Sequence, residues 1–274
     1  MAIVQVSSDS GKTYNVRYSA PFGGLYVSTP ESEAAMATIK NEVGDAAWKK
    51  GFTGTKGDSV SSRIRSRAKE LGVTPIAITG RITNARIVMK QMDDGRQQAY
   101  LQVTLADNES RTYLSVGAGS QGAQMLIRKL VSAQPGVDCE LNMFATYGQN
   151  KSSGKWFAEH GASFKQGGAE VKGVDPRIAL APQVQAAEAA LKAAGIDDKE
   201  TLSKRRQKVT FDFHVALMDD VTKRFQAWYD EQHKSEHVPA SHSGGEDAGS
   251  EAGSDAGHDY EGAGGYDEDN VPVF

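Results

Sequence analysis

The sequence lacks the features that would place the protein in a membrane or in an oxidising compartment. Its 274 residues include one cysteine, Cys139, so no disulfide can form within the chain and a reducing compartment is expected. No apolar run approaches the ~18 residues that a membrane-spanning helix needs. The N-terminus has no apolar core of the kind found in a signal peptide. We therefore expect a soluble, cytoplasmic protein.

Basic residues are absent from the C-terminal segment. Residues 238–274 contain no Lys or Arg but nine acids, which are Glu246, Asp247, Glu251, Asp255, Asp259, Glu261, Asp267, Glu268 and Asp269. Residues 1–237 hold all 31 bases and the other 26 of the 35 acids, a net charge of +5. A basic body with an acidic tail suggests a domain that binds a polyanion and carries its own competitor.

Residues 75–166 alternate apolar and polar side chains with the period of two that is typical of half-buried strands. One stretch with helical spacing falls between the third run and the fourth. We predict a helix at 121–133 and strands at 75–90, 97–106, 110–116, 137–147 and 155–164. Three strands, a helix and two strands is the order of an OB-fold, a five-stranded barrel whose second and third strands and two loops bind oligonucleotides or oligosaccharides.

The rest of the chain is expected to extend this core. Residues 1–74 read as short strands and helices that pack on it, one helix being capped by Thr29 with Pro30 at its first position. Residues 167–237 are predicted to form a helical extension that includes a helix near 212–232. Residues 238–274 have the composition of a disordered acidic tail. The predicted class is thus mainly β with added helices (α+β).

The second and third predicted strands present aromatic rings on their polar side. Ala99, Leu101, Val103 and Leu105 should be core, which turns Tyr100 outward, and Tyr113 and Arg111 alternate outward in the next strand. Flat rings and cations suit single-stranded nucleic acid, because bases stack on the rings and the cations meet phosphates. The alternative interpretation is an ordinary solvated sheet face with cross-strand tyrosine pairs.

The alternation slips within the first predicted strand. Ile76, Ile78 and Ile82 share one parity while Ile87 and Met89 share the other. One extra residue near 83–86, a β-bulge, would restore a single core face. The cations of this strand, Arg81, Arg86 and Lys90, would then point outward.

A second group of cations lies between residues 49 and 69. Seven bases oppose one acid there, and aromatic residues flank the first lysines. The one-signed bias favours a contact with phosphates, although a solvated helix face is the alternative. The candidates taken from this stretch are Trp48, Lys49, Lys50, Phe52, Arg63 and Arg67.

The loop at 148–154 joins the last two predicted strands and corresponds to a ligand-gripping loop of an OB-fold. Aromatic and basic residues bracket it, namely Tyr147, Lys151, Lys155 and Trp156. Trp156 could alternatively belong to the core. No metal-ligand spacing is found: His214 with Asp219 and Asp220 does not form one.

Residues 117–122 match G-x-G-x-x-G, the fingerprint of dinucleotide binding. The preceding strand alternates polar and apolar residues, whereas the strand of a dinucleotide fingerprint is buried on both faces and nearly all apolar. No further βαβ units follow. The glycines are better interpreted as a sharp turn from the third strand into a helix that plugs the barrel, with cofactor binding as the alternative.

The chain ends in DEDNVPVF, an acid run followed by a short apolar cluster and a terminal ring. This end resembles the C-terminal tip of single-stranded DNA-binding proteins, in bacteria an acid run followed by Ile-Pro-Phe, and of the replication SSBs of tailed phages. Val273, between Pro272 and Phe274, departs from the bacterial pattern. The N-terminal seventy residues match no bacterial SSB and favour a phage protein, which would act in the host cytoplasm. The resemblance implies that replication proteins such as a polymerase, helicase or primase bind Asp267, Glu268, Asp269, Pro272 and Phe274.

These observations together predict a non-catalytic protein that binds single-stranded DNA without sequence preference in replication, recombination or repair. No cofactor and no metal are expected, and a homodimer is compatible with the C-terminal helices. Two alternatives remain: a nucleotide-dependent enzyme that uses residues 117–122, and an RNA-binding or assembly protein whose tail is only a solubiliser.

Overall fold

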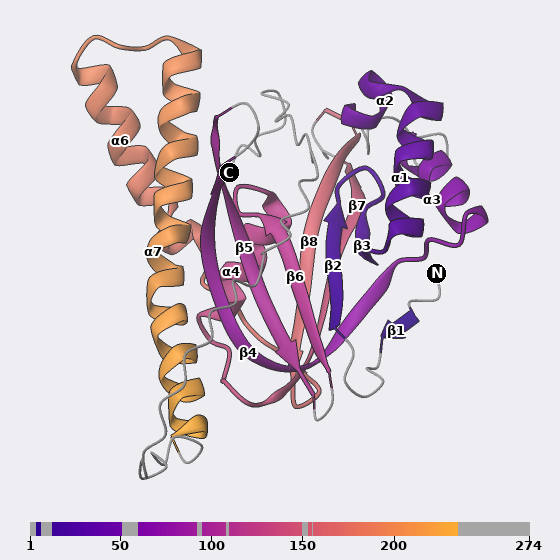
Figure 1. Cartoon of the computed structure of the whole chain (residues 1–274). Helices are drawn as coiled ribbons and strands as arrows, with labels where there is room; N and C mark the ends of the chain where they lie inside the picture. Colours follow the sequence, from indigo (N-terminus) through magenta and orange to yellow (C-terminus); the bar gives the residue numbers. More distant parts are fainter. Residues whose placement is uncertain are drawn as a thin grey trace, which may run out of the picture.

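The described strands belong to one sheet that closes on itself (Figure 1). The computed structural model describes residues 4–6, 13–50, 60–91, 95–107, 110–149, 153–154 and 156–234. The strands are β1 (Val4–Val6), β2 (Thr13–Ser19), β3 (Gly24–Val27), β4 (Ile76–Gln91), β5 (Gln97–Ala106), β6 (Arg111–Gly117), β7 (Asp138–Gln149), β8 (Trp156–Gln166) and β9 (Ala169–Glu170).

Six strands form a ring in the order β4, β5, β6, β2, β3, β7, and β7 pairs back with β4 from Ile78–Leu141 to Arg81–Asp138. Most neighbours are antiparallel, but β2 runs parallel to β6. Outside the ring, β1 pairs with β4, β8 pairs with β7, and β9 pairs with β8.

The predicted strand phase is confirmed. Along β5, Ala99, Leu101, Val103 and Leu105 are buried while the residues between them are not. The register of β4 against β5 shifts between Ile82 and Asn84, so Thr83 is the extra residue of the expected bulge. This shift keeps Ile82 and Ala85 in the core on either side of the bulge.

Helix α4 (Gln121–Leu130) packs its apolar face into the main core, next to β8 and to α7 (Lys199–His233). Ser120 caps it by accepting a hydrogen bond from the Ala123 backbone N–H. Its buried face includes Ala123, Leu126, Ile127 and Leu130. Gly122 lies so close to β7 that a Cβ atom there would come within 2.7 Å of the Met143 side chain. The glycine therefore permits the close packing of helix on strand.

Three N-terminal helices build a second, smaller core against β3. They are α1 (Pro30–Val43), α2 (Asp45–Lys50) and α3 (Val60–Glu70). Thr29 and Ser32 form a reciprocal capping box with Pro30 in the first turn, as the sequence predicted for the cap. Phe22 and Tyr26 pack with Ile39 and Ile64 of the helices in this second core.

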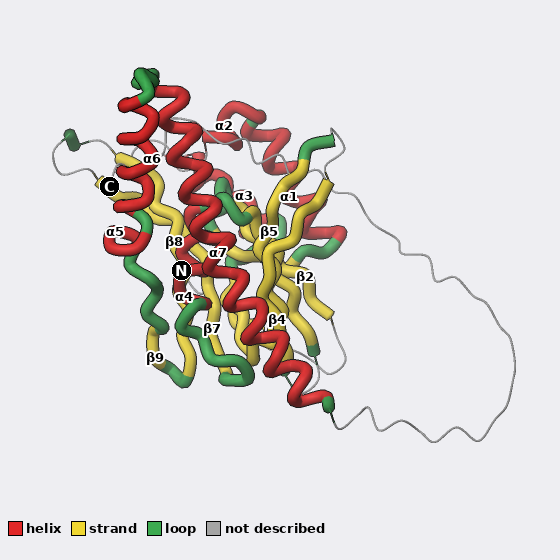
Figure 2. Tube along the Cα trace, turned by 90° about the vertical axis from the view of Figure 1, so that its left-hand side faces the viewer, coloured by secondary structure: helices red, strands yellow, loops and turns green. Residues whose placement is uncertain are grey.

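The C-terminal helices are α5 (Pro176–Ala179), α6 (Ala181–Ala193) and α7 (Lys199–His233). α7 runs along β4, where the Thr222 hydroxyl donates to the Ala85 carbonyl at 2.9 Å and Phe225 enters the main core. The N-terminal part of α7 pairs with α6, and this helical hairpin projects beyond the sheet (Figures 1 and 2).

The protein is therefore a mixed α+β structure with a large sheet. Helix is more extensive than the sequence suggested: α7 begins at Lys199 and spans 35 residues. The N-terminal segment also differs from expectation, because β2 and β3 are members of the ring rather than elements packed onto it. The predicted disordered tail at 238–274 lies outside the described residues.

Candidate nucleic-acid interface

Four neighbouring strands, β4, β5, β6 and β2, share a surface that points away from the core. We call it the outer face. The register aligns its side chains in rows across the strands. One row is Arg86, Gln102, Ser115 and Arg17; a second is Asn84, Thr104, Tyr113 and Asn15; a third is Arg81, Ala106, Arg111 and Thr13. The outer face continues toward the end of the β4–β5 hairpin with two more pairs, Val88 with Tyr100 and Lys90 with Gln98.

Tyr100 is held in place by its neighbours. Its hydroxyl donates to the Gln98 side-chain oxygen at 3.1 Å. Lys90 Nζ lies 5.4 Å from the centroid of its ring, a cation–π distance. The half-buried ring thus has an ordered position next to a cation, which is a suitable arrangement for stacking a base and contacting its phosphate.

Tyr113 is the more open ring of the two. It is 38% exposed, and its strand neighbours on the outer face are the polar residues Thr104 and Asn15. A tyrosine surrounded by short polar side chains is not covered by apolar packing. It can therefore accept a base without a rearrangement of the core.

Two arginines of the outer face are available for phosphates. Arg86 and Arg111 are exposed and make no ion pair within the part of the chain that the structure describes. Arg81, which the sequence grouped with them, lies 3.8 Å from an Asp138 carboxylate oxygen. The outer face therefore offers two uncompensated guanidinium groups, and Lys90 adds a third positive charge.

The outer face ends at β2, next to the acidic side chain of Glu33. Glu33 of α1 accepts hydrogen bonds from the Tyr26 hydroxyl at 3.2 Å and the Ser28 hydroxyl at 2.6 Å, and Arg17 Nη1 lies 3.5 Å from it. Burial and the Glu33 charge raise the pKa of Tyr26. A phosphate would be repelled here, so Glu33 marks a boundary of the outer face.

Sequence reasoning missed the contribution of β2. Thr13, Asn15 and Arg17 extend the outer face by one strand because β2 pairs parallel with β6. One of the short strands expected within residues 1–74 was at 12–18, and β2 confirms it. No local signal identifies a partner strand about a hundred residues away, so their place beside Tyr113 could not be read from the sequence.

In the basic stretch 49–69, the described residues 60–69 do not form one continuous cationic surface. Arg67 is bound by Glu42, with N···O distances of 2.9–3.2 Å, and by Glu70 at 2.9 Å. Trp48 packs against the second core rather than standing free. Of the residues predicted here, Arg63 is exposed on α3.

Arg65 of α3 has a structural task. It donates to the carbonyls of Phe22 at 2.7 Å, Gly23 at 3.0 Å and Ala145 at 2.9 Å. These bonds attach α3 to the β2–β3 turn and to β7. The guanidinium group of Arg65 is therefore bound to backbone carbonyls and does not form part of an open phosphate site.

The remaining predicted residues are not brought to the outer face by any described contact. Tyr147 and Trp156 lie near the ends of β7 and β8, where Tyr147 pairs with Ala158 and Trp156 with Gln149. Lys49 and Lys50 end α2. Outside the described residues lie Phe52, Lys151, Lys155, Asp267, Glu268, Asp269, Pro272 and Phe274.

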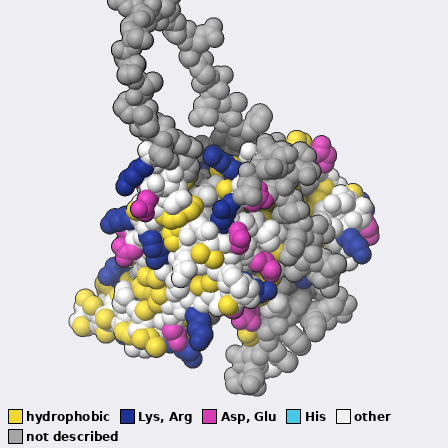
Figure 3. All heavy atoms as spheres, turned by 90° about the horizontal axis from the view of Figure 1, so that it is seen from below, with side chains coloured by type: hydrophobic (Ala, Val, Ile, Leu, Met, Phe, Trp, Pro, Cys, Tyr) yellow, Lys and Arg dark blue, Asp and Glu magenta, His cyan; other side chains and the backbone are white. Residues whose placement is uncertain are grey.

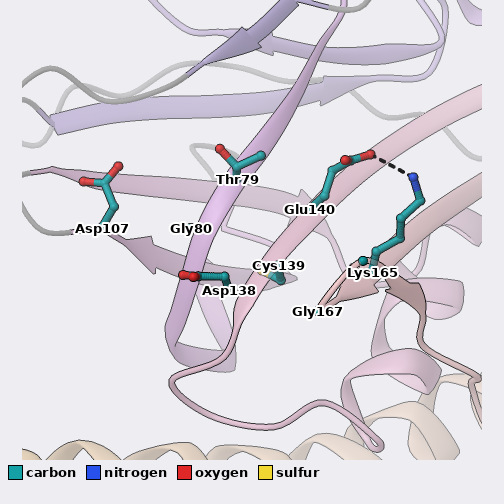
Figure 4. Close-up of a pocket in the computed structure, with 9 residues that line it drawn as sticks. Thr79, Gly80, Asp107, Asp138, Cys139, Glu140, Lys165 and Gly167 are labelled. Atoms are coloured by element: carbon teal, nitrogen blue, oxygen red, sulfur yellow. Dashed lines mark hydrogen bonds and ion pairs between the residues drawn. The ribbon is translucent and has the colours of Figure 1, made fainter.

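A shallow pocket of about 420 Å³, lined by residues of β4, β7 and β8, does not suit a polyanion (Figure 4). Three carboxylates line it, those of Asp107, Asp138 and Glu140, against the single cation Lys165, which pairs with Glu140 at 3.2 Å. On the face of the molecule seen from below, acidic and basic side chains are interspersed (Figure 3). Burial raises the pKa of the Cys139 thiol to about 12, so this residue stays protonated and is a poor nucleophile.

The 117–122 glycine loop has the geometry of a turn and not of a dinucleotide site. β7, the strand after α4, is antiparallel to each of its partners β3, β4 and β8. A dinucleotide fingerprint needs a parallel βαβ unit. The Ser120 hydroxyl also caps α4 and donates to the Gly117 carbonyl at 2.9 Å.

No group of three or more metal-ligating side chains occurs among the residues that the structure describes. In the same residues, every helix is too short or too polar to cross a bilayer. Comparison of the chain with protein-family models, with curated proteins and with solved structures finds no match. The outer face itself is therefore the basis for a functional conclusion.

Proposed function

We propose that this protein binds single-stranded DNA without sequence preference, and that the outer face of β4, β5, β6 and β2 is its binding surface. The observation that carries the proposal is the joint display of two tyrosines and two arginines on one open sheet surface. The tyrosines are Tyr100 and Tyr113, and the arginines, Arg86 and Arg111, make no ion pair with any described residue. Bases stack on the rings and phosphates meet the guanidinium groups. This combination is sequence-tolerant because every base has an aromatic face.

The strand order supports an OB-like core. β4, β5 and β6 form a meander, α4 follows, and β7 returns to pair with β4. The hairpin β5–β6 then corresponds to the second and third strands on which OB-folds bind oligonucleotides. In this protein β2 occupies the free edge of β6, and the ring is completed through β3.

The single-strand preference follows from the kind of contact. Stacking on a tyrosine needs a base whose face is exposed, whereas the bases of a duplex are covered by one another. Among the described residues, the outer face also has only a few uncompensated cations, too few for the electrostatic contact of a protein that holds duplex DNA by its phosphates alone. We propose accordingly that the protein is not an enzyme, needs no cofactor or metal, and acts by covering single strands during replication, recombination or repair.

The acidic tail is proposed to have two tasks. Its nine acids can compete with DNA for the cations of the body, and its end, with Phe274, can recruit replication proteins. We also propose that the protein can form a homodimer.

The test is a titration of labelled oligo-dT with the full chain and with Tyr100→Ala/Tyr113→Ala. Each lost stack should weaken binding by about 1–3 kcal/mol. Phe157→Ala, an exposed aromatic on β8, is the matched control and should bind as the unchanged protein does. Thermal unfolding checks that the variants are folded. Equal affinity of the double variant and the unchanged protein for oligo-dT would contradict the proposal. A second measurement adds unlabelled RNA of the same length as a competitor. If the RNA displaces labelled oligo-dT more effectively than unlabelled oligo-dT does, the surface binds RNA.

A further inference from the structure

The two rings of the outer face are too far apart for neighbouring stacked bases. Tyr113 pairs with Thr104, and Tyr100 lies four residues from Thr104 along β5. Four residues of strand and one interstrand spacing separate the two Cα atoms by ~14 Å. Stacked nucleotides advance ~3.4 Å each, and an extended strand roughly twice that. A strand that uses both rings must therefore carry an intervening nucleotide, which lies over the row between them.

That row contains an amide without a partner. Gln102 is the residue of β5 midway between Tyr100 and Thr104, with Arg86 on one side of it and Ser115 on the other. It is half-buried, and its side chain makes no hydrogen bond among the residues that are described. The neighbouring Gln98, by contrast, accepts a hydrogen bond from the Tyr100 hydroxyl.

We infer that Gln102 binds the hydrogen-bonding edge of the base between the two stacked bases. This inference rests on the proposed function. A carboxamide offers a donor and an acceptor side by side, and exchanges their positions when it rotates by 180°. The Watson–Crick edge of each base in a single strand also presents a donor beside an acceptor. Gln102 therefore contacts any base in the middle position, which adds affinity and preserves sequence tolerance.

The contact also gives the surface a chemical selectivity that stacking alone lacks. A base whose Watson–Crick edge is paired or alkylated cannot engage the amide, although its faces remain able to stack. The preferred ligand of the outer face is thus a single strand with open base edges. Duplexes, and single strands alkylated at the Watson–Crick edge, should therefore bind more weakly.

The experiment compares oligo-dT with oligo-N3-methyl-dT of equal length, in which every Watson–Crick edge is blocked and the phosphates are unchanged. The full chain is measured against Gln102→Leu and against Gln97→Leu. Gln97 lies on the same strand with the opposite parity, so it is a matched control. Thermal unfolding confirms that both variants are folded.

The full chain and Gln97→Leu should bind the methylated strand about five-fold or more weakly, the least expected of a bidentate contact with a base. Gln102→Leu should bind the two strands equally well. Equal loss in all three proteins, or no loss in any, would overturn the role of Gln102 while leaving the proposed function intact. Failure of the full chain to bind oligo-dT would instead overturn the proposed function.

Discussion

The two unpaired arginines of the outer face allow a quantitative prediction. Arg86 and Arg111 lie on different strands and are exposed, with no ion pair in the described part of the chain. If each contacts one phosphate of a single strand, each contributes about −0.7 to the slope of log affinity against log salt. Replacing both by glutamine should therefore make the slope shallower by about 1.4.

The same relation sets the size of the affinity loss. If the two proteins bind equally at about 1 M salt, a slope change of about 1.4 makes Arg86→Gln/Arg111→Gln bind oligo-dT about 25-fold more weakly at 0.1 M and about three-fold more weakly at 0.5 M. The assay is fluorescence anisotropy of labelled oligo-dT over this range of salt. Arg177→Gln/Lys192→Gln removes the same charge from the C-terminal helices α5 and α6, which pack on each other and on α7.

That control should keep the original slope. The reasoning would be refuted if both double variants lost the same amount of slope, because the effect would then come from net charge rather than from phosphate contacts at the outer face. A loss of affinity that is independent of salt would also refute it, since counterion release is the stated source of the energy.

Two further predictions concern stability and the tail. His214 is 2% exposed, and burial lowers its pKa to about 4, so the unfolded chain binds more protons between pH 6.5 and 4 and stability must fall as the pH falls. Urea unfolding at pH 7 and pH 4.5 should show a loss of about 2 kcal/mol from this residue that His214→Leu does not show; an unchanged loss in the variant would assign the acid sensitivity elsewhere. Removing residues 238–274 should tighten single-strand binding, more at low salt than at high, because tethered acids act at about millimolar effective concentration. Deleting Phe274 alone should leave DNA affinity nearly unchanged and abolish capture of a replication polymerase, and equal effects of the two truncations on DNA binding would contradict this division.

The strand faces could be predicted because side-chain direction in a strand is a local property. Alternate residues of a strand share a face, so the four apolar residues of β5 lie on one side. That side packs into the core because its side chains are apolar. The residues are Ala99, Leu101, Val103 and Leu105. The bulge at Thr83 follows from the same constraint, because it is where the apolar residues of β4 change parity. Tyr100 and Tyr113 were therefore placed correctly.

The partners of charged residues could not be predicted, because a cation in the sequence does not reveal what it binds. Arg65 and Arg67 are two residues apart in one basic run. The first holds two carbonyls of the β2–β3 turn and one of β7, and the second holds a glutamate 25 residues earlier in the chain. Both partnerships depend on how α3 packs, which is a tertiary property. The parallel pairing of β2 with β6 is non-local in the same way, and it brought Asn15 and Arg17 to the outer face.

The length of α7 was underestimated for a related reason. Its core-facing residues Met218, Val221 and Phe225 show a clear helical period, and they indicated a helix from about 212. The preceding part of α7 contacts α6, where Arg206 donates to Glu188 at 2.8 Å, and it has no fully buried residue before His214. The true start is marked by a cap, Asp198, whose carboxylate accepts a hydrogen bond from the Thr201 backbone N–H at 2.8 Å.

The most direct test of single-strand binding is a titration of the full chain with labelled oligo-dT and with a duplex of the same length, at two salt concentrations. Binding to the single strand should be tighter than binding to the duplex at both, and it should weaken with salt at about −0.7 in the log–log slope for each phosphate contacted. A preference for the duplex, or an affinity for oligo-dT that does not change with salt, would contradict the account.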